Sequence, residues 1–484
     1  MDKKQQGLSA GHLTMMALGT VIGGSFFLGS SVAINAAGPS ILIAYVLGGI
    51  LVYFILYALS EITVANPHSG SFHTFAAQIF GPGIGFVVGW VYWTGMVLSM
   101  SSEATAVSIL LRNWIPNIPI SLLGSLIIIA VTLLNLLGAT KLSKLESSLA
   151  AVKLIAIVSF IVISILLILG IINKTTPIGI GELTREPFAP GGIKGIAGSM
   201  LIVMFAYAGF EIIGLAASET AQPRKTIPKA IRNTVFALVS LYILSILVLL
   251  PLTPTSMLNE NMSPLVATLN RWGMGWASSV MNFVLITAIL SASLAAMFGI
   301  GRMMRSLADE GQAPAWLKDK KDVPYRGILF SGFSMLLAFW LGLLFPRMYL
   351  FLISSGGFAL LFTYIVILAI HIRFRKMNGC PPEGKCQMPG FPYTSWFALI
   401  SMVIIIASMP FISGQGSGLV AGIIMIAVYS LAYGAIRFFA NSKVKNTSNR
   451  SINLRRYNEN FTTEFSKELT DEDNCNCKNK SNKK

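Results

Sequence analysis

The stretch Ala17-Leu-Gly-Thr-Val-Ile-Gly-Gly-Ser-Phe-Phe-Leu-Gly29 places four glycines inside a hydrophobic segment that is long enough to cross a bilayer. A second stretch, Phe205-Ala-Tyr-Ala-Gly-Phe-Glu-Ile-Ile-Gly214, repeats this pattern and contains the acidic residue Glu211. Lipid offers no hydrogen-bond partner to unwound backbone, so such backbone persists only where it lines a cavity. Two interrupted segments, one near the start of each half of the chain, are typical of a transporter's binding site. The alternative is that the glycines only permit close helix packing.

The composition of the chain is that of a membrane protein. Of its 484 residues, 54% are hydrophobic and 12% are charged, and the mean hydropathy is +0.69. The polar start Met1 to Gln6 leads into a full-length span, so no cleavable signal is expected. Apolar runs of about 20 residues recur along the chain, and each is long enough to span a bilayer. The sequence predicts twelve spans, at 13–36, 41–65, 84–111, 119–138, 147–172, 196–218, 233–252, 275–300, 328–345, 348–370, 395–412 and 416–439.

Lysine and arginine are distributed unequally between the loops. Twelve spans put both termini on one side, which then holds 29 of the 36 Lys and Arg residues; the other side holds six, and Lys153 lies within a span. The positive-inside rule places the richer side, and with it both termini, in the cytoplasm of a cell-membrane protein. Because topology accounts for the net charge of +16, nucleic acid is not an expected partner.

The cysteines and the C-terminal tail carry little functional signal. Cys380, Cys386, Cys475 and Cys477 all fall on the reducing cytoplasmic side, so disulfides are not expected. Cys475 and Cys477 leave a soft-metal site open as an alternative, but two ligands make a weak signal, and we predict no metal or cofactor. Residues 441–484 are polar and poor in apolar side chains, which predicts a disordered tail.

Five motifs occur in order between about residues 8 and 440. They are Leu18–Ser30, Glu61 with Pro67–Phe72, Gly85–Trp93, Phe205–Gly214 with Ser218–Pro228, and Gly301–Gly311. Together they resemble an amino acid permease of the amino acid–polyamine–organocation (APC) superfamily. The resemblance implies an all-α polytopic membrane protein with the leucine-transporter-type fold.

The implied fold has ten core helices in two inverted five-helix repeats. These would occupy residues 13–374, with the repeats at about 13–172 and 196–374, after a cytoplasmic segment at 1–12. A cytoplasmic loop and two extra helices would follow at 375–440, giving twelve transmembrane helices in all. The resemblance implies a substrate held mid-membrane between the broken first and sixth helices, which agrees with the position of the two glycine-rich stretches.

The two breaks suggest how an amino acid zwitterion is held. Backbone N–H groups at the start of a half-helix favour an anion, and free carbonyls at the end of one favour a cation. The candidate carboxylate ligands are the amides around Gly23, Gly24 and Ser25. The candidate ammonium ligands are the carbonyls of Ile22, Phe205 and Ala208, close to the second break at Gly209. The family usually has Gly-x-Gly at the first break, so the hydroxyl of Ser25 is a departure that either binds the carboxylate or narrows the pocket.

Side-chain specificity would come from the walls of this site. The resemblance suggests Phe205, and less directly Tyr207, as walls, although an aromatic side chain in a span is also typical of packing. Ser99, Ser101 and Ser102 either line the path or pack between helices. The sequence contains no carboxylate that must face a cationic substrate side chain, which favours a neutral amino acid.

Ionisable residues inside spans are costly to bury and are therefore candidates for ion coupling. The resemblance implies that Lys153, on the fifth helix, replaces a bound cation, ties this helix to carbonyls of the broken first helix and can release a proton; snorkelling is the alternative. Glu211 and Glu103 either handle protons or accept bonds from nearby backbone. Ser291 falls where the family has polar groups near its cation site, although Leu294 replaces the amide that often follows.

These features predict a sodium-independent, proton-coupled secondary transporter of amino acids. Exchange of amino acids is an open alternative, and a non-transporting amino acid sensor is another. An enzyme is not expected, because the chain shows no constellation of nucleophile, base or metal ligands. A Gly-x-x-x-x-Gly-Lys-[Ser/Thr] phosphate loop does not occur, so transport would draw on a gradient instead of ATP.

Overall fold

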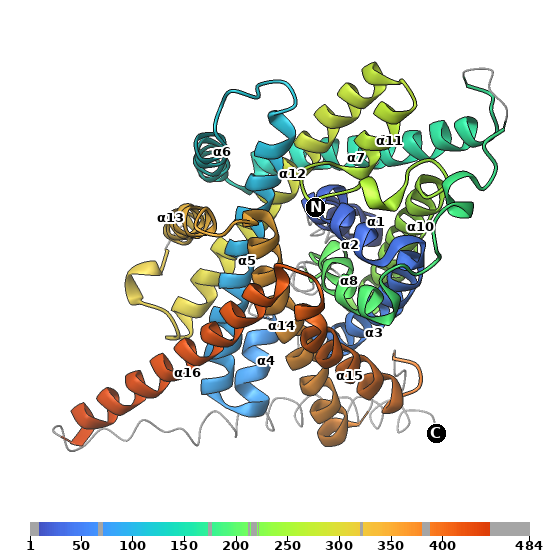
Figure 1. Ribbon diagram of the computed structural model, residues 1–484. Helices are drawn as coiled ribbons and strands as arrows, with labels where there is room; N and C mark the ends of the chain where they lie inside the picture. Colours follow the sequence, from blue (N-terminus) through green and yellow to red (C-terminus); the bar gives the residue numbers. More distant parts are fainter. Residues whose placement is uncertain are drawn as a thin grey trace, which may run out of the picture. The chain divides into compact units, whose positions relative to one another are not determined.

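The computed structural model describes residues 9–65, 71–172, 177–211, 213, 220, 222–319, 323–379 and 388–445, and in these ranges all regular structure is helical (Figure 1). The chain divides into a unit of residues 1–430 and a unit from Leu431 onward. Of the predicted tail at 441–484, only residues 441–445 are described, as the end of the last helix. The rest of the tail and all four cysteines lie outside the described residues. The longer helices are α1 (Ala10–Val21), α2 (Ser30–Ala37), α3 (Ile41–Ala65), α4 (Ser71–Phe80), α5 (Pro82–Leu111), α6 (Ile120–Asn135), α7 (Ala139–Ile168), α8 (Gly192–Ala206), α10 (Pro223–Leu249), α11 (Pro264–Arg271), α12 (Gly275–Asp309), α13 (Tyr325–Gly342), α14 (Met348–Asn378), α15 (Tyr393–Ser408) and α16 (Gln415–Lys445).

Each predicted span contains helix in the structure, although the span at 196–218 is helical only as far as Ala206, continues as turns to Glu211, and then lies mostly outside the described residues. Within the described residues, nine segments are long and apolar enough to cross a membrane, and the shorter apolar helices α6 and α8 lie at two further predicted spans. The first of the nine, Ser25–Val64, joins the second half of the first predicted span to the whole of the second. The chain is therefore an all-helical membrane protein.

Both glycine-rich stretches interrupt their helices. Helix α1 ends at Val21, and Ile22 takes an extended conformation (φ −75°, ψ 95°) before a short π-helix begins at Ser25 and continues into α2. Helix α8 ends at Ala206 and is followed by turns to Glu211, with Gly209 at φ +106°, a conformation that favours glycine. The glycines therefore unwind the backbone at both places instead of only easing helix packing.

Helix α5 runs through the middle of the first unit and packs against α14, α12, α4 and α13 (Figure 1). Helix α12 also contacts α7 and α1, and α8 contacts α2, α3 and α14. This packing brings the two broken segments to the same side of α5. A cavity lined by residues of both broken segments forms between them.

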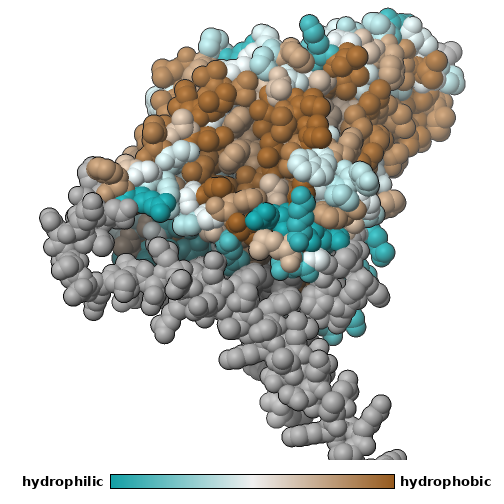
Figure 2. All heavy atoms as spheres, turned by 90° about the horizontal axis from the view of Figure 1, so that it is seen from below, coloured by the Kyte–Doolittle hydropathy of each residue, from teal (hydrophilic) through white to brown (hydrophobic). Residues whose placement is uncertain are grey.

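The outer helices present large apolar side chains outward. Leu126 on α6, Ile155 on α7, Trp340 on α13 and Ile400 on α15 are each more than half exposed. Figure 2 shows a broad apolar surface with polar side chains gathered along its edges. Exposed apolar area of this extent is expected where helices face lipid hydrocarbon.

At one end of the helices, Glu61 of α3 lies in a fully buried polar cluster. Its Oε2 accepts hydrogen bonds from Arg375 Nε at 2.7 Å, and His371 Nε2 lies 2.7 Å from the same oxygen. Its Oε1 accepts from Arg375 and, at 2.6 Å, from the Met388 N–H. Arg375 and His371 of α14 therefore hold Glu61, a residue of the second motif, in place.

Replacing Arg375 with methionine is expected to lower the free energy of unfolding by about 3–5 kcal/mol, because it leaves a buried carboxylate without its main counter-charge. Arg185→Met is the matched control, since Arg185 is 75% exposed and its pair with Glu182 is worth at most about 1 kcal/mol. Denaturant unfolding of the two purified variants in detergent measures this difference. Equal stabilities would show that the Glu61 cluster does not hold these helices together.

Candidate binding site

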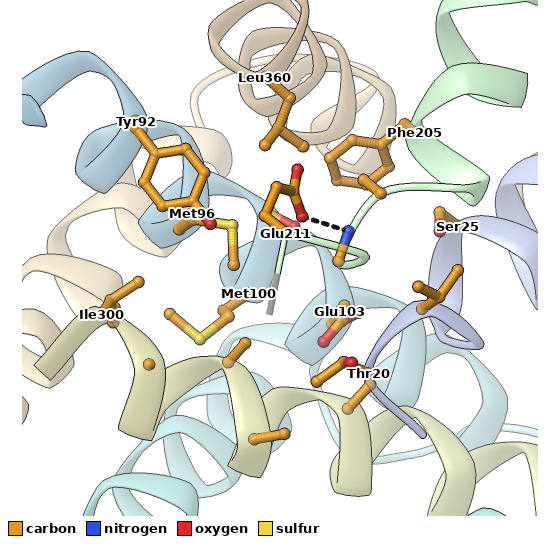
Figure 3. A pocket seen from close by; sticks show the side chains of 18 of the residues that line it. Thr20, Ser25, Tyr92, Met96, Met100, Glu103, Phe205, Glu211, Ile300 and Leu360 are labelled. Atoms are coloured by element: carbon orange, nitrogen blue, oxygen red, sulfur yellow. Dashed lines mark hydrogen bonds between the residues drawn. The ribbon is translucent and has the colours of Figure 1, made fainter. Parts of the chain in front are cut away.

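The two breaks lie against each other. A Cβ built on Gly209 would be 3.3 Å from the backbone C and O atoms of Thr20, so the turn after α8 packs directly on the last residues of α1. The Gly209 N–H donates to Glu211 Oε2 at 2.9 Å, as Figure 3 shows, and Tyr364 of α14 donates to Glu211 Oε1 at 2.5 Å. Glu211 therefore fixes the unwound turn and connects it to α14.

Most backbone groups at the first break also have partners. The Gly23 carbonyl accepts from the N–H groups of Phe26 and Phe27, each at 3.2 Å, and the Gly24 carbonyl accepts from the Tyr349 hydroxyl at 3.2 Å. The Glu103 side chain of α5 lies against this break, with its Cγ 3.6 Å from where a Cβ on Gly24 would stand. An acidic side chain of the protein therefore already lies where the sequence places a substrate carboxylate.

Glu103 joins the break to two further helices. Ser293 Oγ on α12 donates to Glu103 Oε2 at 2.5 Å, and the Lys153 ammonium on α7 is close enough to stabilise the carboxylate electrostatically. Space next to Gly23 is filled by the same side chain, because a Cβ there would lie 2.7 Å from Glu103 Oε1. Glycine at this position is therefore needed for the close approach of Glu103 to the backbone.

Lys153 lies deep in the helix packing, with 1% of its surface exposed. Its Nζ donates to the Gly19 carbonyl at 2.5 Å, so the ammonium joins α7 to the last turn of α1. Since the chain is buried at this point, the side chain does not snorkel. This is the contact that the family resemblance implies for a lysine on the fifth helix.

A cavity of about 80 Å³ lies between the breaks, α5 and α12, with room for several water molecules (Figure 3). Of the candidate site residues, it is lined by Ser25, Phe205, Ala208, Gly209, Glu103 and Glu211. Ile22, Gly23 and Gly24 lie behind the lining, in the break itself. Ser99 also lines the cavity, whereas Ser101 and Ser102 donate to backbone carbonyls within the helix packing.

Tyr207 lies outside the cavity lining. Its hydroxyl donates to the Tyr45 carbonyl at 3.1 Å, and its ring packs against those of Tyr45 and Tyr242. It is fully buried, and this corresponds to the packing alternative. Ser291 is also buried outside the lining, and no described residue forms a hydrogen bond with its Oγ.

Comparison with known proteins identifies the family. The profile of the family described as "Amino acid permease" matches residues 12–449. The chain belongs to the amino acid permease family, within the APC superfamily. The resemblance inferred from the five motifs is thereby confirmed. The family groups this chain with transporters that span the membrane, and not with enzymes.

Individual permeases match over most of their length. The chain is 32% identical over 442 residues to the gamma-aminobutyric acid permease of Bacillus subtilis (strain 168), covering 88% of this chain and 94% of the relative. It is 32% identical over 453 residues to the gamma-aminobutyric acid permease of Escherichia coli (strain K12), covering 91% and 97%. It is 30% identical over 439 residues to a probable threonine/serine transporter of Bacillus subtilis (strain 168), covering 89% and 94%.

Several residues that line the cavity of this permease were missed by the sequence analysis. They share helical spacing on two helices, which is a signal that the sequence does contain. On α5 they are Tyr92, Met96 and Met100, in register with Ser99 and Glu103. On α12 they are Ala292, Ala295, Ala296, Gly299, Ile300 and Met303, at i, i+3, i+4, i+7, i+8 and i+11.

The charge of the cavity limits which ligands it accepts. Glu103 and Glu211 carry its carboxylates, and among the described residues that line it none is Lys, Arg or His. An ammonium group is therefore favoured and an acidic side chain is disfavoured. Within the described ranges no three His, Cys, Asp or Glu side chains are grouped as metal ligands would be.

Proposed function

We propose that this permease imports a neutral amino acid across the cell membrane by alternating access. The observation that carries the proposal is the cavity at the junction of two unwound helices, with carboxylates on its wall and a mostly apolar remainder. The substrate ammonium would face Glu211 and the carbonyl of Ala208, both of which line the cavity. Phe205 and the methionines of α5 and α12 would surround an uncharged side chain.

We further propose that protons, and not sodium ions, drive uptake. In support, the Lys153 ammonium occupies the region between α7 and the last turn of α1, where a bound cation would otherwise be needed. Lys153, Glu103 and Glu211 are the candidate proton carriers, and Ser291 is a polar neighbour on α12. The proposal includes twelve transmembrane helices in a 5+5 inverted repeat plus two, with both termini and the predicted tail in the cytoplasm.

Uptake into proteoliposomes that hold the purified protein tests this function. The panel of labelled substrates should include threonine, serine and gamma-aminobutyric acid, which the names of the relatives suggest, together with larger neutral and charged amino acids. We expect accumulation of a neutral amino acid with an inward proton gradient, and loss of this accumulation when a protonophore is added. An inward sodium gradient without a proton gradient should give no accumulation.

Each of the other possible results would assign a different function to the protein. Uptake only into liposomes preloaded with amino acid would show an exchanger. Uptake driven by sodium alone would contradict the role given to Lys153, and binding without flux would indicate a sensor. Liposomes without protein provide the background for each condition.

A further inference from the structure

The Glu103 carboxyl group lies beside the first break, where a substrate carboxylate would be bound. Its Oε2 accepts a hydrogen bond from the Ser293 hydroxyl, and its Oε1 lies 2.7 Å from where a Cβ on Gly23 would stand. The Lys153 ammonium contacts the same broken helix, at the Gly19 carbonyl. Backbone N–H groups at the start of a helical segment favour an anion, and a nearby ammonium adds to this preference. The side chain is partly exposed and lines the cavity, so it is accessible to a ligand there.

We propose that the Glu103 carboxylate occupies the subsite for the substrate carboxylate and is displaced from it when the substrate binds. The inference rests on the transport function proposed above. It gives Glu103 a role as an internal competitor of the substrate instead of a ligand for it. Gly23 is part of this arrangement, because only glycine leaves room for Glu103 Oε1 beside the break.

Charge balance connects this displacement to proton uptake. A bound substrate carboxylate and a free Glu103 carboxylate would place two like charges in one membrane cavity, which is unfavourable. If the displaced Glu103 takes one proton from the aqueous side, it becomes a neutral acid, and the number of carboxylate charges beside the break stays at one. The substrate ammonium faces Glu211, and the site as a whole gains one positive charge, that of the proton. One proton would then enter the site with each substrate molecule. Substrate affinity should consequently rise as pH falls.

The test compares the ligand affinities of Glu103→Ala and wild type. The two ligands are the neutral amino acid with the highest uptake and its α-carboxamide, in which an amide replaces the carboxylate. Glu103→Ala removes the carboxylate that competes with the substrate carboxylate, so it should tighten binding of the amino acid about tenfold. Binding of the carboxamide, which has no carboxylate, should stay within about twofold of wild type. Glu260→Ala, which removes a carboxylate near Arg347 outside the cavity, is the matched control and should change neither affinity.

A second variant, Glu103→Gln, keeps the shape and the Ser293 contact but lacks the charge. It should bind the amino acid with an affinity between those of wild type and Glu103→Ala, and its affinity should no longer depend on pH. Weaker binding of both ligands by either variant would overturn the proposal, because Glu103 would then hold the substrate ammonium.

Acetate gives a measurement that needs no substrate. If Glu103 fills a carboxylate subsite, acetate should raise the melting temperature of Glu103→Ala more than chloride does at equal ionic strength, and should not do so for wild type. No acetate effect would overturn the proposal. If acetate stabilises Glu103→Ala but the protein binds no amino acid, the carboxylate subsite is retained and the transport function is rejected. Failure of the subsite proposal and failure of the proposed function therefore give different results.

Discussion

Replacement of Lys153 by methionine is expected to abolish proton-driven accumulation of substrate. The Lys153 ammonium donates to the Gly19 carbonyl at 2.5 Å and stabilises the Glu103 carboxylate. Methionine fills a similar volume but supplies neither a donor nor a charge. The last turn of α1 then loses its connection to α7, and Glu103 remains inside the membrane without its counter-charge.

The same substitution should lower the free energy of unfolding by about 1–3 kcal/mol, the usual cost of leaving a buried hydrogen-bonding group, here the Gly19 carbonyl, without its donor. Adding Glu103→Gln to Lys153→Met should restore part of this loss, because the uncompensated charge is then removed. A double-mutant cycle on unfolding free energies measures the coupling between the two side chains. Additive effects would contradict an electrostatic interaction between them.

Lys194→Met is the matched control for transport. Lys194 lies at the start of α8, is exposed, and has its Nζ 5.9 Å from the ring centroid of Phe411. We expect uptake by this variant to stay within about twofold of wild type, since an exposed cation–π contact is worth only about 0.5–1 kcal/mol. Persistent proton-driven accumulation in Lys153→Met would refute the coupling role of this lysine.

Local patterns were sufficient to locate the helices and their breaks. The predicted span at 41–65 coincides with α3, because an unbroken apolar run determines both the length and the environment of a helix. The unwound turn at Gly209 was likewise predictable, since glycine is needed at its positive φ. Signals of this kind depend only on residues that are close in sequence.

The partners of the ionisable residues could not be found in this way. Ser293 is 190 residues from Glu103, and Tyr364 is 153 residues from Glu211. These pairs exist because α12 and α14 pack against the middle of the molecule, and hydropathy periodicity does not indicate which helices become neighbours. The same limit explains Tyr207, whose sequence position beside the break did not show that its ring turns toward Tyr45 and Tyr242.

Alanine in place of Gly209 is expected to reduce uptake at least tenfold. Gly209 has φ +106°, where an L residue is strained by about 1–3 kcal/mol. The added Cβ would also press on the Thr20 backbone at 3.3 Å, so relief of this contact moves the two breaks apart. Movement of the turn displaces the Gly209 N–H from Glu211 and thereby disturbs the geometry of the cavity.

Gly273→Ala separates the effect of backbone strain from the effect on the site. Gly273 also has a positive φ, +72°, but a Cβ there would meet no atom within 4 Å. Both variants should therefore be less stable than wild type, whereas only Gly209→Ala should lose uptake. Initial uptake rates, normalised to the amount of folded protein in the liposomes, measure this difference. Equal loss in both variants would show that strain alone, and not the contact between the two broken helices, accounts for the defect.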